Sequence, residues 1–139
     1  MKKSFELALK QAEKALKRSE VPIGALLMKD GKIIARAHNQ TEKKKTFLAH
    51  AEMICIQRAC KKLNSKYLTG CDLFVTLEPC LMCRTAAKLS RIKNIYYLTK
   101  SEKFGSRGPG YFKSKNRRIT SPLTQRSVDL LQDFFRQRR

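Results

Sequence analysis

Two short motifs, His50-Ala51-Glu52 and Pro79-Cys80-Leu81-Met82-Cys83, constrain this chain most, because their side chains suit a single metal ion. One imidazole and two thiolates can bind zinc and leave its fourth position open, as in catalytic zinc sites. His50, Cys80 and Cys83 can act together only if the fold brings both segments to one point. Glu52 would then carry protons while zinc-bound hydroxide attacks an amino-bearing carbon.

Hydrophobic periodicity predicts a layered α/β fold in one domain, residues 1–139. Strands alternate with helices in the middle of the chain, which indicates a parallel element in the sheet. The predicted elements are a helix over 4–18, strands over 21–28 and 32–37 joined by a turn at Asp30-Gly31, a polar loop over 39–48, a helix over 49–63, a strand over 73–77, a helix from Pro79 to about 90, a strand over 92–98, a loop or lid over 101–116, a short strand over 118–121 and a helix from Pro122.

Both metal-binding segments fall at predicted helix starts. Cys80 and Cys83 are three positions apart and therefore share a helix face. A helix N-terminus carries positive partial charge, which favours the thiolate form that binds zinc. The donor set favours zinc without excluding iron or another metal.

The charge balance is strongly basic, with 31 Lys and Arg against 11 Asp and Glu, a formal net charge of +20. Such an excess predicts a polyanionic partner, and nucleic acid suits it best. A solvated lysine-rich surface is the alternative, although it leaves the arginine clusters unexplained. The basic clusters are Lys43-Lys44-Lys45, Arg117-Arg118 and Arg136-Gln137-Arg138-Arg139.

Five cysteines without a recognisable export signal predict a reducing, cytoplasmic location. The first ten residues begin like a signal peptide, but Glu6 and Lys10 interrupt the apolar stretch. No segment approaches the length of a membrane span. Cys55 and Cys60 fit an apolar helical pattern and are predicted in the core, whereas Cys71 fits either the core or an additional metal ligand.

The order His-x-Glu followed by Pro-Cys-x-x-Cys is the signature of zinc-dependent deaminases of bases and nucleosides. Beyond that signature, the chain resembles the TadA-type tRNA adenosine deaminases from about residue 20 to its C-terminus. The tail matters most, because it lies outside the shared catalytic motif. The matching segments are Val21-Pro22-Ile23-Gly24-Ala25, His50-Ala51-Glu52, Thr76-Leu77-Glu78-Pro79-Cys80-Leu81-Met82-Cys83, Ser90-Arg91-Ile92 and Leu130-Leu131-Gln132-Asp133-Phe134-Phe135-Arg136-Gln137-Arg138-Arg139.

This resemblance implies a three-layer cytidine-deaminase-like fold, with a central mixed five-stranded sheet flanked by helices. It implies a homodimer with one zinc ion per subunit, and conversion of adenosine to inosine at the wobble position of a tRNA anticodon stem-loop. A flipped-out base is consistent with this chemistry, since the reacting carbon is inaccessible within a stack. The implied site comprises the metal ligands His50, Cys80 and Cys83, the catalytic Glu52, and the substrate contacts Asn39, Ala51, Pro22, Lys103, Arg136 and Arg138.

Three segments depart from the family pattern and are expected at the rim of the site, where they bear on substrate range. They are Thr46-Phe47-Leu48-Ala49 before the metal-binding histidine, Arg84 after the second cysteine, and Ser101-Glu102-Lys103-Phe104-Gly105 after the fourth strand. Which tRNA species are edited does not follow from the sequence.

Several side chains allow two interpretations. Asn39 is either a base contact or a turn residue. Lys43-Lys44-Lys45 and the C-terminal arginines are either phosphate contacts or solvated surface. His38 is predicted at the rim or surface, and Glu78 either hydrogen-bonds near the metal loop or ends a strand. Phe134 and Phe135 are both predicted as packing residues.

Two other functions remain open from the sequence. A zinc-dependent deaminase of a free base, nucleoside or nucleotide keeps the motif but does not explain the basic charge. A non-enzymatic zinc module that binds RNA would need a fourth protein ligand, for which Cys71 and His38 are the candidates.

Overall fold

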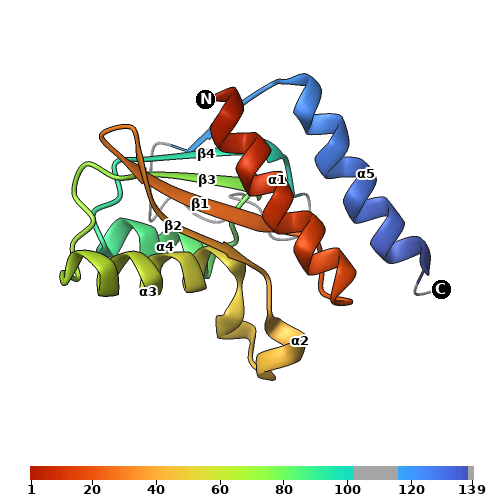
Figure 1. Cartoon of the computed structure of the whole chain (residues 1–139), viewed down its shortest axis with the longest axis horizontal. Coiled ribbons are helices and arrows are strands. Elements are labelled where there is room, and N and C mark those ends of the chain that lie inside the picture. Colours follow the sequence, from red (N-terminus) through yellow and green to blue (C-terminus); the bar gives the residue numbers. More distant parts are fainter. Residues whose placement is uncertain (102–115, 138–139) are drawn as a thin grey trace.

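The computed structural model describes residues 1–101 and 116–137, which form one sheet with helices on both faces (Figure 1). Lys103, Phe104, Arg138 and most of the expected loop over 101–116 lie outside the described residues. None of the described helices is long and apolar enough to cross a bilayer. The elements are α1 (Lys2–Lys17), β1 (Gly24–Lys29), β2 (Lys32–His38), α2 (Thr41–Lys44), the 3₁₀ turn η1 (Phe47–Ala49), α3 (Ala51–Leu63), β3 (Asp72–Leu77), α4 (Leu81–Leu89), β4 (Asn94–Thr99), β5 (Asn116–Arg118) and α5 (Pro122–Gln137).

The sheet has five strands in the order β2-β1-β3-β4-β5, which confirms the expected mixed sheet. β1 runs antiparallel to both of its neighbours, whereas β3, β4 and β5 run parallel to one another. Asp30 and Gly31 join β1 to β2 with positive φ angles of 51° and 76°. A two-residue type I′ hairpin turn requires positive φ at both positions. The last strand lies slightly earlier in the chain than the predicted 118–121.

Alternate side chains of the sheet enter two cores, as the two-residue period of a strand requires. Leu26, Phe74 and Leu98 pack with residues of α1 and α5. Leu27 and Val75, which follow Leu26 and Phe74 in their strands, pack with residues of α3 and α4. The protein therefore has three layers, with α1 and α5 covering one face of the sheet and α3 and α4 covering the other (Figure 1).

Two sequence predictions about local structure are wrong. The segment 39–48 is not a plain loop, because it contains α2 and the start of η1. Elements this short carry no measurable hydrophobic period. Pro79 does not begin a helix, since α4 starts at Leu81 with Cys80 as its N-cap. The ligand loop is thus extended up to the first sulfur.

Helix α5 has two apolar rows that face different surroundings. The row containing Phe135 does not enter the core, and Phe135 is 55% exposed. Phe134 is buried as expected, whereas Phe135 packs only at the surface, with its ring centroid 5.2 Å from that of Phe134. The row that packs on the sheet side consists of Leu123, Ser127, Leu130 and Phe134.

At Gly24 the backbone of α1 packs directly against the sheet. An added Cβ would overlap the carbonyl oxygen of Ala8 and lie 2.7 Å from the backbone nitrogen of Ala12. Both atoms belong to the backbone of α1, so the helix itself would have to move. We expect Gly24→Ala to lower the free energy of unfolding by about 3 kcal/mol or more. Urea denaturation measures this loss.

Gly31→Ala is the matched control, because a Cβ there meets nothing within 4 Å. Its positive φ of 76° should cost only about 1 kcal/mol. Equal losses for both variants would contradict the close packing of α1 on β1.

Candidate metal centre and active site

Three metal-binding side chains from two distant segments converge at one point. His50 Nδ1 lies 3.7 Å from Cys80 Sγ and 3.5 Å from Cys83 Sγ, and the two sulfurs are 3.8 Å apart. A tetrahedral zinc with Zn–S near 2.3 Å and Zn–N near 2.05 Å separates two sulfurs by about 3.8 Å, and nitrogen from sulfur by about 3.6 Å. The donor spacing therefore fits a tetrahedral metal ion.

The backbone places these donors at two helix N-termini. His50 is the N-cap of α3, Cys80 is the N-cap of α4, and Cys83 lies in the first turn of α4. Unpaired N–H groups at these ends favour negative charge. α4 connects the parallel strands β3 and β4, so its N-terminus lies near the end of β3.

The two thiols share protons unequally. The hydrogen bond with Cys83 is the main cause that lowers the pKa of Cys80 to about 4. The same bond and burial raise the pKa of Cys83. The hydrogen bond to Cys80 also raises the pKa of His50. A bound cation would favour the thiolate at both cysteines and neutral imidazole at His50.

Glu52 lies in the first turn of α3, beside the donor group. Its side chain is buried, and burial is the main cause that raises its pKa. The backbone amide of Glu52 and the charge on His50 oppose this rise in pKa, and Cys83 opposes it to a smaller extent. A carboxyl group with a raised pKa can hold and release a proton close to neutral pH.

A cavity of about 970 Å³ opens above the donor group, with His50, Glu52 and Cys80 in its wall. This volume is at the upper end of the range for sites that enclose a small ligand. Ala51, a predicted substrate contact, also lines the cavity. The other lining residues are Val21, Ile23, Asn39, Thr41, Phe47, Leu77, Glu78, Ser101, Leu131 and Phe135.

Asn39 lines the cavity with a buried amide. Its Nδ2 donates to the carbonyl oxygen of Val21 at 3.4 Å, which orients the amide. Its Oδ1 is buried and has no hydrogen-bond partner among the described atoms. An unpaired buried acceptor is costly, and a ligand in the cavity could satisfy it.

Pro22 is fully buried and lies between two cavity-lining residues. The amide of Ile23 donates to the carbonyl of Val21 at 2.8 Å, which closes a tight turn around Pro22. This proline therefore shapes the wall of the cavity through its neighbours.

The start of α5 is anchored to the sheet beside the cavity. Ser127 Oγ donates to the carbonyl of Thr76 at 2.8 Å and accepts from Thr99 Oγ1 at 2.8 Å. Leu131 and Phe135, on the following turns, line the cavity. Sequence reasoning missed Leu131 and Phe135 as site residues, although their row, with Val128, is separate from the row that contains Phe134.

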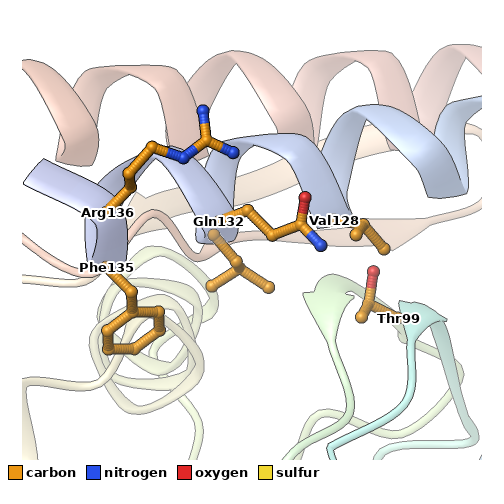
Figure 2. A pocket seen from close by; sticks show the side chains of 6 residues that line it. Thr99, Val128, Gln132, Phe135 and Arg136 are labelled. Carbon is orange, nitrogen blue, oxygen red and sulfur yellow. The ribbon is translucent and has the colours of Figure 1, made fainter.

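A second groove, of about 340 Å³, lies along the same side of α5 and shares Leu131 and Phe135 with the cavity. Figure 2 shows Gln132, Phe135 and Arg136 along α5, with Thr99 on the neighbouring strand. Arg136, a predicted substrate contact, is exposed and forms an ion pair of 3.6 Å with Asp133.

Neither candidate for a fourth protein ligand belongs to the donor group. Cys71 is fully buried in the core between the sheet and the helices α3 and α4, away from the donor group. Cys55 and Cys60 pack in the same core, as predicted. His38 is also buried, so its prediction as a rim or surface residue is wrong. Its Nε2 has no partner among the described atoms. The donor group within residues 1–101 and 116–137 therefore has three members.

The segments that depart from the family pattern lie in different environments. Phe47 is 82% exposed and lines the cavity, as expected of a rim residue. Arg84 is buried and does not line the cavity, so its prediction as a rim residue is wrong. Glu78, also buried, accepts a hydrogen bond from the amide of Ser101 at 3.1 Å, and both residues line the cavity. Glu78 thus fixes the described end of the segment that follows β4.

The family model of the MafB19-like deaminases matches residues 1–139 of this chain. A tRNA-specific adenosine deaminase of Agrobacterium fabrum is 41% identical over 142 residues, covering 97% of this chain and 93% of that protein. The protein of the same name from Bacillus subtilis is 40% identical over 139 residues, covering 95% of this chain and 86% of that protein.

A solved chain from a study of A-to-I editing by tRNA:A34 deaminases at the wobble position superposes with a TM-score of 0.86 and 37% identity. The match covers 94% of this chain and all of that chain. A guanine deaminase from Nitrosomonas europaea has a TM-score of 0.82 at 20% identity, covering 94% of this chain and 82% of that chain. The second likeness concerns the fold alone.

Proposed function

The chain belongs to the MafB19-like deaminases and to the family of tRNA-specific adenosine deaminases, and from this premise we propose that it converts adenosine to inosine at the wobble position of a tRNA anticodon. The observation that carries the proposal is the composition of one cavity. It joins a three-donor metal group, a buried carboxyl group with raised pKa, and an unpaired amide oxygen. The net charge of +20 supports a polyanionic substrate.

We propose one zinc ion per subunit, held by His50, Cys80 and Cys83. Bound there, zinc would supply Lewis acidity that lowers the pKa of water to about 7. The donor types and their spacing support this assignment. Three protein ligands also leave room for a reactant, as hydrolysis requires.

Glu52 is the proposed proton carrier. It takes one proton from the attacking water and delivers it to adenine N1, then takes the second proton from the oxygen newly bonded to C6 and delivers it to the departing amine. Oxygen becomes bonded to C6, the C6–N bond breaks and ammonia leaves. Burial of Glu52 supports the role, because the raised pKa keeps its protonated form accessible for the second transfer.

The adenine is proposed to bind between Asn39 and the start of α3. Asn39 Oδ1 can accept a hydrogen bond from the base, while Ala51 and the turn at Pro22 give the cavity its width. We propose that Arg136, together with Lys103 and Arg138 outside the described residues, contacts phosphates. A flipped nucleotide leaves its backbone at the mouth of the cavity, where such cations can reach it.

We further propose a single catalytic domain that works as a homodimer in the cytoplasm. Large apolar side chains on η1 and α4 support a contact between subunits, since Phe47, Leu48, Leu81 and Leu89 are each more than half exposed. The free cysteines of the described chain are consistent with a reducing compartment.

Competing substrates test the reaction. The zinc-loaded protein should form inosine from an anticodon stem-loop far faster than it deaminates free adenosine, cytidine, cytosine or guanine. Nucleoside mass spectrometry and ammonia release measure both classes. Equal specificity constants for RNA and a free base or nucleoside would favour the alternative, a deaminase of small substrates.

Binding of tRNA should weaken steeply with salt. Each phosphate contact releases counterions, and contributes a slope of about −0.7 to −0.9 in a plot of log affinity against log salt concentration. With several contacts we expect a total slope steeper than about −3. Fluorescence anisotropy of labelled tRNA measures this slope. An affinity that does not change with salt concentration would show that the basic surface does not bind RNA.

A further inference from the structure

The outer face of α1 has an unusual charge pattern. Its half-buried acids, Glu6 and Glu13, lie to one side, and Glu13 pairs with Arg126 of α5. A solvated helix face ordinarily mixes both signs of charge. Here every exposed position between residues 2 and 18 holds Lys or Arg, namely Lys2, Lys3, Lys10, Lys14, Lys17 and Arg18.

These cations form a stripe opposite the buried side of the helix. At 100° per residue, Lys3, Lys10, Lys14 and Lys17 fall within a sector of about 60°. None of the four forms an ion pair with a residue that the structure describes. At 1.5 Å per residue the stripe from Lys3 to Lys17 is about 21 Å long, so it extends along nearly the whole of α1.

Helix stability does not explain the whole stripe. Lys14 and Lys17 lie in the last turn, where positive charge stabilises the helix macrodipole. Lys2 and Lys3 lie in the first turn, which contains no acid, and there positive charge is unfavourable. Folding alone therefore gives no reason for a continuous row of cations along α1.

A buried carboxylate joins this stripe to the mouth of the cavity. Glu20, directly beyond α1, accepts hydrogen bonds from the amides of Glu42 and Lys43, both at 2.9 Å. These bonds hold α2 beside the C-terminal end of α1 (Figure 1). The lysines at 43–45 are thereby held near the C-terminal end of α1, which carries Lys17 and Arg18, despite the repulsion between like charges.

The charge at the end of α1 acts on a residue next to the cavity wall. His38 precedes Asn39, and after burial itself, Arg18 and Lys14 are the largest causes that lower its pKa. Arg58 lowers it further, while Glu20 raises it. The charge at the end of α1 thus acts on His38, the last residue of β2, directly before the proposed base contact Asn39.

We propose that the α1 stripe, Lys3, Lys10, Lys14 and Lys17, binds the phosphates of the tRNA stem that continues from the anticodon loop, which rests on the proposed function. The loop occupies the cavity, the lysines at 43–45 contact the adjoining backbone, and the stem lies along α1. Charge complementarity supports this occupant, because a duplex presents closely spaced phosphates along a straight axis.

The test compares two RNA ligands with two charge-matched variants. One RNA is a full-length tRNA, and the other is an anticodon loop closed by a short stem of about three base pairs. The test variant carries Lys10→Gln, Lys14→Gln and Lys17→Gln. The control carries Lys61→Gln, Lys62→Gln and Lys93→Gln, exposed positions that include the far end of α3. Glutamine keeps helix propensity close to that of lysine.

The test variant should bind full-length tRNA on the order of 10- to 100-fold more weakly than wild type at physiological salt, with a salt slope reduced by about 2 to 3. Its binding to the short stem-loop and its kcat on that substrate should be unchanged. The control variant should bind both RNAs like wild type.

Three other outcomes would overturn the inference. They are equal tRNA binding by wild type and test variant, equal losses of affinity for both RNAs, and, in a parallel binding assay with anionic phospholipid vesicles, a loss of affinity for the vesicles but not for tRNA. Failure of the proposed function would give a different result, because wild type, test variant and control variant would then all form no inosine from either RNA.

Discussion

Replacing Glu52 with alanine should reduce deamination of the anticodon stem-loop by about a thousandfold or more, while one metal ion per chain remains bound. A positioned acid–base group contributes about 10²- to 10⁴-fold, and Glu52 is proposed to act in more than one proton transfer. The three donors do not include this carboxyl group, so metal affinity should be largely retained. Single-turnover formation of inosine and elemental analysis measure the two quantities.

Glu42→Ala provides the matched control for Glu52→Ala. Glu42 is an exposed carboxylate on α2, beside a cavity-lining threonine, and it does not itself line the cavity. Its removal should leave kcat within about twofold, since surface substitutions usually have small effects. A Glu52→Ala protein that kept activity, or that lost its metal, would contradict the role assigned to Glu52.

Replacing Cys83 with serine should remove both the metal and the activity. Cys83 is fully buried and one of only three donors in the described group, so its loss leaves two. We expect metal affinity to fall on the order of 10³-fold, because ligand bonds provide most of the binding free energy. A chelator should lower the Tm of the metal-loaded wild type, and this shift should be absent in the variant.

Cys55→Ala tests whether the effect is specific to the donor group. Cys55 is equally buried, but it packs in the core, and burial raises the pKa of its thiol to about 12. Its removal should lower Tm modestly while one metal ion per chain is retained. Full metal content in Cys83→Ser, or metal loss in Cys55→Ala, would contradict the proposed centre.

The sequence predicted the convergence of the donors because local rules operate at both helix starts. His50 and Cys80 each precede a clear apolar helical pattern, and both are N-caps in the structure. The alternation of strands and helices likewise predicted the parallel pairing of β3 with β4. The helix starts and the alternation of elements depend on residues close together in the chain, which periodicity and capping rules describe well, whereas the meeting of His50 with Cys80 and Cys83 was predicted from the metal-binding motif.

The predictions that were wrong concern features that depend on tertiary contacts. His38 is polar and ends a strand, yet the packing around it leaves it buried. Arg84 likewise follows a ligand in the sequence but turns out to be buried away from the cavity wall. Phe134 and Phe135 are adjacent and equally apolar, and only the docking angle of α5 decides which one enters the core. The sequence contains no local signal for that angle.

The proposed substrate contacts likewise depend on tertiary structure or on a bound partner. Asn39 acquires its significance from an unpaired oxygen within a cavity, which no sequence pattern reveals. Lys103, Arg136 and Arg138 stay predictions, because their partners would be RNA phosphates.

The most direct test of the central claim is the fate of the wobble nucleotide in heavy-oxygen water. The zinc-loaded protein, incubated with a tRNA that carries adenosine at the wobble position, should yield inosine there with one heavy oxygen atom. Position-mapped mass spectrometry after nuclease digestion detects it. Unchanged adenosine at that position, or inosine without the label, would contradict hydrolytic deamination of tRNA by this site.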